Sequence, residues 1–182
     1  MSKRPTFMHI LAISGSLRPA SANTSLLRAA AQLVPAGVTV SLYDGLDELP
    51  HFSPERDVEN APPAVETLRT QLRAADAVLI CTPEYAHGIP GVLKNMLDWV
   101  VSSGEFMNKP TGVISAATGG EYAHASLTET LSVMSAQLLE GASLIVSFVR
   151  TKIDAEGRIT DAQTAVAVQT VLNTLVVGAG VG

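Results

Sequence analysis

The segment Phe7-Met8-His9-Ile10-Leu11-Ala12-Ile13, followed directly by Ser14-Gly15-Ser16-Leu17-Arg18-Pro19-Ala20-Ser21-Ala22-Asn23, decides the fold. A mostly apolar run that stops at a Ser/Gly turn is typical of a buried strand. Beyond it, Leu26, Leu27, Ala30 and Leu33 stand at helical spacing, which predicts a helix over residues 24–34. The first part of the chain therefore reads as strand, loop and helix.

The same alternation continues to the C-terminus. Residues 77–81 (Ala-Val-Leu-Ile-Cys) form a continuous apolar run, as a central parallel strand buried on both faces requires. Residues 44–59 form a polar connection without a clear period. The remaining predicted strands are 38–43, 111–116 and 143–149, and the remaining predicted helices are 62–74, 91–101, 122–139 and 161–176.

Alternating strands and helices without an internal repeat predict an α/β fold, with a parallel sheet covered by helices on both faces. The pattern fits an open doubly wound sheet better than an eight-stranded barrel, which needs about 250 residues. The chain has 182 residues, which is the size of one domain. We expect its core over 6–176 and a flexible tail over 177–182.

Composition excludes several classes of protein. Hydrophobic residues make up 47% of the chain and charged residues 16%, which favours a well-packed core over disorder. The net charge of -5 and the lack of a basic run argue against nucleic-acid binding. No apolar stretch reaches the roughly 20 residues of a membrane span. Cys81 is the single cysteine, so we predict a buried inert thiol, no multi-cysteine metal site and a soluble cytoplasmic protein.

In sheets of this kind, ligands bind beyond the carboxyl ends of the strands. That rule selects the loops 14–23, 82–90 and 117–121. The first loop offers hydroxyl groups, Arg18 and the unpaired backbone N–H groups at the start of a helix, a combination that suits a phosphate. It matches neither the Walker nor the dinucleotide motif. The alternative is a simple helix cap, with Asn23 as the cap residue and Arg18 in solvent.

The second loop contains two prolines and two glycines, which restrict its backbone as a loop holding a planar ring requires. Tyr85 and His87 are candidates to border such a ring, although His87 is as readily a surface residue. Glu84 either contacts the ligand or bonds a backbone amide. Trp99 is expected in the core or at a subunit contact. In the third loop, Gly119 and Gly120 permit close approach to a ligand or serve only as turn residues.

At these residues the chain resembles the NADPH-dependent FMN reductase family, which includes quinone, chromate and azo-dye reductases. The first matching block is Gly15-Ser16-Leu17-Arg18-x-x-Ser21-x-Asn23. The second is Pro83-Glu84-Tyr85-x-x-x-x-Pro90-Gly91-x-Leu93-Lys94-Asn95-x-x-Asp98-Trp99. Many members have Asn directly after Pro-Glu-Tyr, whereas Ala86 and His87 follow here. The resemblance implies a flavodoxin-like sheet with strand order 2-1-3-4-5.

The resemblance also implies FMN and NADPH or NADH as cofactors, with the flavin near the interface of a homodimer or a dimer of dimers. The flavin carries the chemistry, so no catalytic side chain is assigned. The electron acceptor would be a quinone, an azo compound, a metal oxyanion or free flavin. Positions matching the family's cofactor-binding loops are Ser14, Ser16, Arg18, Ser21, Asn23, Pro83, Glu84, Tyr85, Ala86, Thr118, Gly119 and Gly120.

Two other functions remain to be weighed. A flavodoxin-type electron carrier would also bind FMN, but it would lack turnover with NAD(P)H. A serine hydrolase would use Ser14 or Ser16, both of which follow a strand. The chain lacks the G-x-S-x-G elbow of such hydrolases, and no Asp-then-His order is convincingly placed behind the serine. An FMN-dependent NAD(P)H oxidoreductase is therefore the favoured interpretation.

Overall fold

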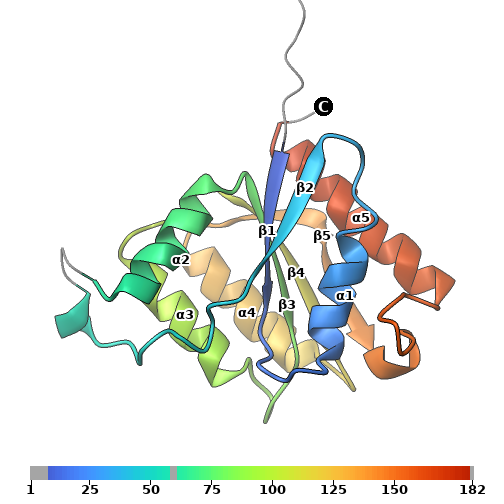
Figure 1. Ribbon diagram of the computed structural model, residues 1–182, viewed down its shortest axis with the longest axis horizontal. Coiled ribbons are helices and arrows are strands. Elements are labelled where there is room, and N and C mark those ends of the chain that lie inside the picture. The colour runs from blue at the N-terminus through green and yellow to red at the C-terminus, as the bar shows by residue number, and fades with distance from the viewer. Residues whose placement is uncertain (1–7, 58–60, 181–182) are drawn as a thin grey trace, which may run out of the picture.

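The computed structural model describes residues 8–57 and 61–180, and it contains one parallel sheet with helices on both faces (Figure 1). The strands are β1 (Met8–Ser14), β2 (Val38–Tyr43), β3 (Ala77–Thr82), β4 (Pro110–Ala117) and β5 (Gln137–Ser147). Their order in the sheet is β2-β1-β3-β4-β5, and all neighbouring pairs are parallel. The predicted fold class and strand order are confirmed.

Five α-helices and two 3-10 turns accompany the strands within the described residues. The helices are α1 (Ala22–Ala30), α2 (Pro63–Ala74), α3 (Gly91–Val101), α4 (Glu121–Val133) and α5 (Ala162–Gly178). The 3-10 turns are η1 (Pro54–Arg56) and η2 (Val149–Thr151). No helix in residues 8–57 and 61–180 combines the length and apolar character needed to cross a membrane.

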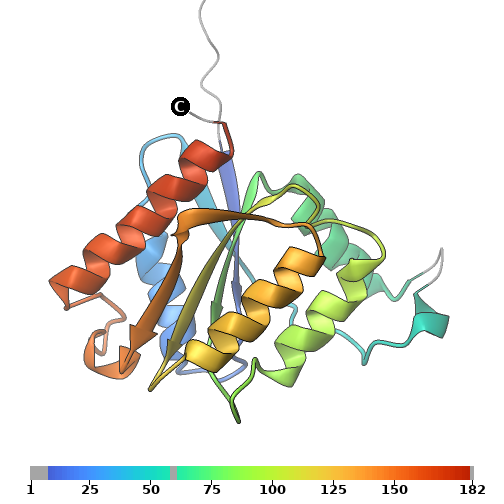
Figure 2. The same ribbon diagram turned by 180° about the vertical axis from the view of Figure 1, so that it is seen from behind.

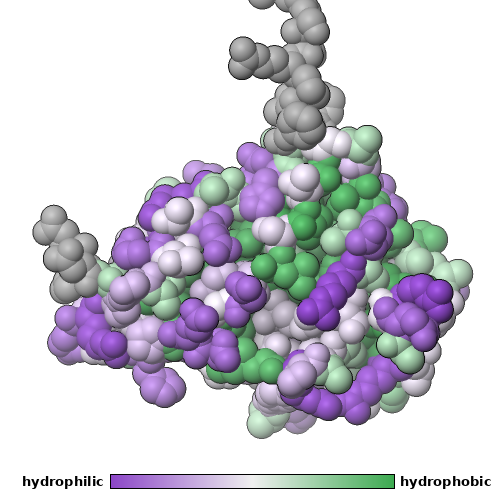
Figure 3. All heavy atoms as spheres, viewed as in Figure 1, coloured by the Kyte–Doolittle hydropathy of each residue, from purple (hydrophilic) through white to green (hydrophobic). Residues whose placement is uncertain are grey.

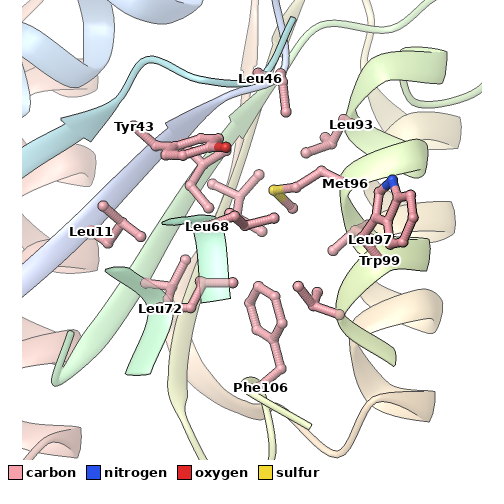
Figure 4. Packing of buried hydrophobic residues seen from close by; sticks show 14 of the residues in the cluster. Leu11, Tyr43, Leu46, Leu68, Leu72, Leu93, Met96, Leu97, Trp99 and Phe106 are labelled. Atoms are coloured by element: carbon pink, nitrogen blue, oxygen red, sulfur yellow. The ribbon is translucent and has the colours of Figure 1, made fainter. Parts of the chain in front are cut away.

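Side chains alternate between the two faces of the sheet and so build two separate cores. Leu11, Ile13 and Ile80 belong to the cluster on one face, together with residues of α2, α3 and α4. Figure 4 shows Leu11 in this cluster with Leu68 of α2 and Leu93 of α3. Ile10, Ala12 and Leu79 point to the other face, against α1 and α5. Every residue of β3 is buried, because it is the central strand and helices cover both of its faces. The continuous apolar run in the sequence reflects that position.

The two edge strands differ in their surroundings. Strand β2 lies at one edge of the sheet. On the face of the molecule seen in Figure 3, which has the view of Figure 1, hydrophobic side chains gather near the middle, between more hydrophilic regions. Val38, Val40 and Leu42 of β2 are only partly buried against the core, as expected at a sheet edge. Strand β5 forms the opposite edge, with α5 on one side and α4 on the other (Figure 2).

The predicted boundary between the fourth helix and the fifth strand is wrong. Helix α4 ends at Val133 instead of residue 139, and β5 begins at Gln137 instead of residue 143. Ser135 has a φ of 59°, which breaks the helix, and Gln137 and Leu138 then pair with β4. A shift in the pairing register between Thr111 and Val113 accommodates the residues that follow. Pairing across strands thus overrides a locally helical sequence.

The other boundaries shift by a few residues. Helix α1 begins at Ala22 and ends at Ala30, against the predicted 24–34, and α5 continues through Gly178. The predicted tail over 177–182 is therefore helical at its start. Phe7 of the first predicted strand lies outside the described residues, as do residue 6 of the predicted core, residues 58–59 of the polar connection and residues 181–182 of the tail.

Candidate functional site

A cavity of about 370 Å³ lies at the carboxyl ends of β1, β3 and β4, at the lower end of the sheet in Figure 1. The predicted site residues that line it are Ser16, Arg18, Ser21, Asn23, Pro83, Glu84, Tyr85 and Thr118. Ser14, Ala86, Gly119 and Gly120 do not line it. The structure therefore brings together side chains from all three loops that the strand order selects.

The first loop is shaped by a helix cap and by close packing. Ser21 is the N-cap of α1, and its Oγ accepts a hydrogen bond from the Thr24 N–H at 3.3 Å. The prediction of Asn23 as the cap residue is wrong, because Ser21 caps the helix. The Thr24 hydroxyl donates to Ser14 Oγ at 2.9 Å, which occupies the Ser14 side chain within the loop. A Cβ atom on Gly15 would lie 3.0 Å from Thr82 Oγ1, so only glycine lets the loop pack this closely on β3.

Asn23 is buried because it joins three segments of the site. Its Nδ2 donates to the Ala116 carbonyl at 3.1 Å, and its Oδ1 accepts from the Cys81 thiol at 3.2 Å. Burial raises the pKa of Cys81 above its ordinary value, so the thiol stays protonated and inert. This agrees with the predicted buried cysteine. Asn23 thus holds the start of α1 against the ends of β3 and β4.

The second loop contains a tight two-residue turn. The Tyr85 N–H donates to the Gly88 carbonyl at 2.9 Å, and the Gly88 N–H donates to the Tyr85 carbonyl at 3.0 Å. Ala86 and His87 between them have φ values of 50° and 58°, a left-handed conformation that is costly for residues with a Cβ. The His87 ring stacks on Tyr122 with centroids 4.1 Å apart. His87 is therefore an exposed residue with a specific aromatic partner.

Glu84 connects the second loop to the third. Its Oε2 accepts a hydrogen bond from the Ala123 N–H at 2.9 Å, in the first turn of α4. The N-cap position of α4 is Gly120, which has a φ of 132° and no side chain to cap the helix. The Glu84 carboxylate thus satisfies an N–H group that the helix leaves unpaired, and it complements the helix dipole. Of the two roles predicted for Glu84, ligand contact or a bond to a backbone amide, the structure shows the bond to an amide.

His124 links α4 to two strands beside the site. Its Nδ1 lies 3.0 Å from Ser115 Oγ on β4, and its Nε2 lies 2.7 Å from Ser143 Oγ on β5. Burial lowers the pKa of His124 below its ordinary value. The neutral ring can donate from one nitrogen and accept at the other, so both contacts are satisfied without a charge. His124 therefore has a positioning role in the fold.

One lining segment was missed by the sequence analysis. Phe148 and the residues of η2 form a side of the cavity, although 143–149 was predicted to be a strand. Strand β5 ends at Ser147 because Phe148 has a φ of 52°, which turns the chain back toward α1. The available signal was Arg150, a basic residue directly after the last strand and at the same edge as the three loops.

The donor set fits a phosphate group better than it fits nucleophilic catalysis. Ser16, Ser21 and Arg18 offer hydroxyl and guanidinium donors beside the start of α1. In the part of the chain that the structure describes, Ser14 bonds Thr24 and Ser16, and no histidine bonds Ser14 or Ser16. The Ser-His pair that a hydrolase needs is not formed by these groups.

Comparison with known proteins agrees with this geometry. The model of the NADPH-dependent FMN reductase family matches residues 8–151. An NAD(P)H-dependent FMN reductase of Pseudomonas aeruginosa is 36% identical over 171 residues, which is 91% of this chain and 92% of that protein. A quinone reductase of Escherichia coli is 27% identical over 155 residues, 82% of each chain.

Among solved structures, the flavoenzyme NAD(P)H:(acceptor) oxidoreductase FerB of Paracoccus denitrificans superposes with a TM-score of 0.78 at 26% identity. The match covers 95% of this chain and 97% of that one. The family model spans all three loops of the cavity, so the resemblance found in the first two loops extends over most of the fold. The chain belongs to the NADPH-dependent FMN reductase family.

Proposed function

We propose that this protein is an FMN-dependent NAD(P)H oxidoreductase that reduces a quinone or a related acceptor. The observation that carries the proposal is the cavity itself. Hydrogen-bond donors of the first loop that suit a phosphate line it together with Pro83, Glu84 and Tyr85 of the second loop. When bound there, FMN supplies the redox chemistry that moves two electrons from NAD(P)H to the acceptor. The side chains of this chain bind and orient the reactants.

The roles of the predicted site residues follow from their contacts. Ser16, Arg18 and Ser21 are proposed to contact the phosphate, because they line the cavity. Ser14 and Asn23 are proposed to hold the loop in shape, since their side chains bond other protein groups. The ring is proposed to lie along Pro83–Tyr85 and Thr118, while Ala86, Gly119 and Gly120 shape the adjoining turns.

The proposal extends to assembly and location. We propose a homodimer or a dimer of dimers, as the family resemblance implies, supported by the exposed aromatic side chains of Tyr85 and Phe148, which line the cavity. Light scattering on the purified protein would test it. We also propose a cytoplasmic location, since Cys81 is a free thiol and the reaction consumes NAD(P)H. Cell fractionation would test that part.

The decisive experiment is a visible spectrum of the purified protein with added FMN, followed by NADPH under anaerobic conditions. We expect a bound-flavin spectrum that bleaches rapidly and returns when a quinone is added. The same assay with an azo compound, a metal oxyanion or free flavin ranks the acceptors, and NADH in place of NADPH ranks the donors. Bound flavin that NAD(P)H fails to bleach would indicate an electron carrier. A protein that takes up no FMN would contradict the proposal.

A further inference from the structure

We propose that Arg150 is a second cationic contact for the phosphate of FMN, so that the phosphate is held between Arg150 and Arg18. The inference rests on the proposed placement of the FMN phosphate at the first loop. Arg18 belongs to the motif of the first loop, whereas Arg150 comes from η2, which follows the last strand. Both residues line the same cavity.

The first observation is the charge around this cavity. The chain carries a net charge of -5, yet two arginines line one pocket. Within residues 8–57 and 61–180, neither guanidinium group forms an ion pair with a carboxylate. Glu84 is the one carboxylate among the described lining residues, and its Oε2 is bonded to the Ala123 N–H. The cavity therefore presents two positive charges that form no ion pair, against the single negative charge of Glu84.

The second observation is that the backbone holds Arg150 in place. Val149 is buried in the same core cluster as Leu26 and Leu27 of α1, which anchors η2 beside that helix. The Thr151 N–H donates to the Phe148 carbonyl at 2.9 Å, and the Lys152 N–H donates to the Val149 carbonyl at 3.1 Å. Phe148 keeps its left-handed conformation, with a φ of 52°, although it is a bulky residue. Such strain persists where the surrounding structure requires it, often at ligand sites.

The position of η2 favours a contact of Arg150 with the phosphate over a contact with the flavin ring. Helix α1 begins at the end of the first loop, and η2 packs against that helix, whereas the proposed ring wall comes from β3 and β4. A phosphate monoester carries about -1.5 to -2 charges at neutral pH. One guanidinium leaves part of that charge unbalanced, whereas two can match it. Arginine also presents paired N–H donors that suit phosphate oxygens.

The test compares FMN with riboflavin, which has the same ring but no phosphate. Dissociation constants are measured by flavin fluorescence for the wild type, Arg150→Gln and Arg150→Lys. Arg28→Gln is the matched control, because Arg28 lies exposed on α1, outside this cavity, and its replacement removes the same charge. We expect Arg150→Gln to weaken FMN binding by about tenfold. Riboflavin binding and the melting temperature should stay unchanged, and Arg150→Lys should keep most of the affinity for FMN.

Three results would overturn the assignment. Equal FMN affinity in the wild type and Arg150→Gln would show that the residue makes no contact. Parallel losses for FMN and riboflavin would assign Arg150 to the ring or to the fold. A rise in KM for NADPH but not for NADH, with FMN affinity unchanged, would assign it to the phosphate of the nicotinamide cofactor. If the wild type itself failed to bind FMN, the proposed function would fail as well, which separates that outcome from the other three.

Discussion

The Glu84 carboxylate accepts a hydrogen bond from the backbone N–H of Ala123 at 2.9 Å, although the two residues are 39 positions apart. It joins the loop after β3, which lines the cavity, to the first turn of α4. Glu84 belongs to the Pro-Glu-Tyr triplet through which the chain resembles its family. Its contact shows that one residue of a family motif can fix the relative positions of a loop and a helix.

Replacing this carboxylate should loosen the site and destabilise the protein. We expect Glu84→Gln to lower the free energy of unfolding by about 1 kcal/mol, since it removes a charged acceptor at a helix N-terminus. FMN affinity should fall with it. Urea denaturation and FMN titration measure the two effects. Glu121→Gln is the control, because it removes an exposed charge from the same helix turn without breaking the link. Equal effects of the two variants would contradict a linking role.

The turn at Ala86 should carry strain that a substitution can relieve. Ala86 has a φ of 50°, and asparagine tolerates this conformation better than alanine does. We expect Ala86→Asn to raise the free energy of unfolding by about 0.5–1 kcal/mol, measured by urea denaturation. Ala155→Asn serves as the control, because Ala155 is an exposed loop residue outside the group with positive φ. The explanation by backbone strain fails if both variants gain the same stability.

His124 should make the fold less stable in acid. Its pKa is lowered by burial, whereas in the unfolded chain it returns to about 6.5. As the pH falls from about 6.5 toward the lowered pKa, the unfolded state takes up a proton that the folded state does not, so stability decreases. Across that window the loss approaches about 1.4 kcal/mol per pH unit.

The measurement compares urea denaturation at neutral pH with denaturation in mild acid. We expect His124→Gln to lose less stability on acidification than the wild type does, because it has no proton to take up. His51→Gln is the control, because it removes an exposed imidazole from a different part of the chain. If His124→Gln and the wild type lost the same stability, the source of acid sensitivity would lie elsewhere.

A buried ion pair fastens the connection after β2 to α2. Arg69 is 6% exposed and donates to Asp57 Oδ1 at 2.6 Å and to the Trp99 carbonyl at 2.7 Å. We expect Asp57→Ala to cost about 3 kcal/mol of stability, because it leaves the buried Arg69 charge with the more exposed Glu66 as its carboxylate partner. Asp98→Ala, which breaks an exposed pair with Lys94, should cost less than about 0.5 kcal/mol. Calorimetric melting would measure both, and comparable losses would refute the distinction.

Local patterns in the sequence were enough to predict the class of the fold, and the family resemblance supplied the strand order. The apolar run over 77–81 identifies the central strand because burial on both faces leaves no place for polar residues. The rule that parallel strands end at one edge then selects the three loops that line the cavity. Trp99 was expected in the core or at a subunit contact, and it is fully buried beside Phe52.

Contacts between distant segments could not be read from local patterns. Three features depend on neighbours elsewhere in the chain. They are the end of α4 at Val133, six residues before its predicted end, the role of Ser21 as the cap of α1, and the position of Arg150 at the cavity. Gln137 joins a strand because its N–H donates to the Lys109 carbonyl at 2.9 Å, next to the start of β4, and not because its own sequence favours a strand.

The sequence by itself thus determined the alternation of strands and helices, and with it the edge of the sheet where the cavity lies. Hydrophobic periodicity records which face of each element is buried, and that information is local. Only the tertiary structure decided that Glu84 bonds Ala123, that Asn23 bridges β3 and β4, and that Arg150 joins Arg18 at one cavity. These contacts arise where strand ends meet in space, and sequence spacing carries no record of that proximity.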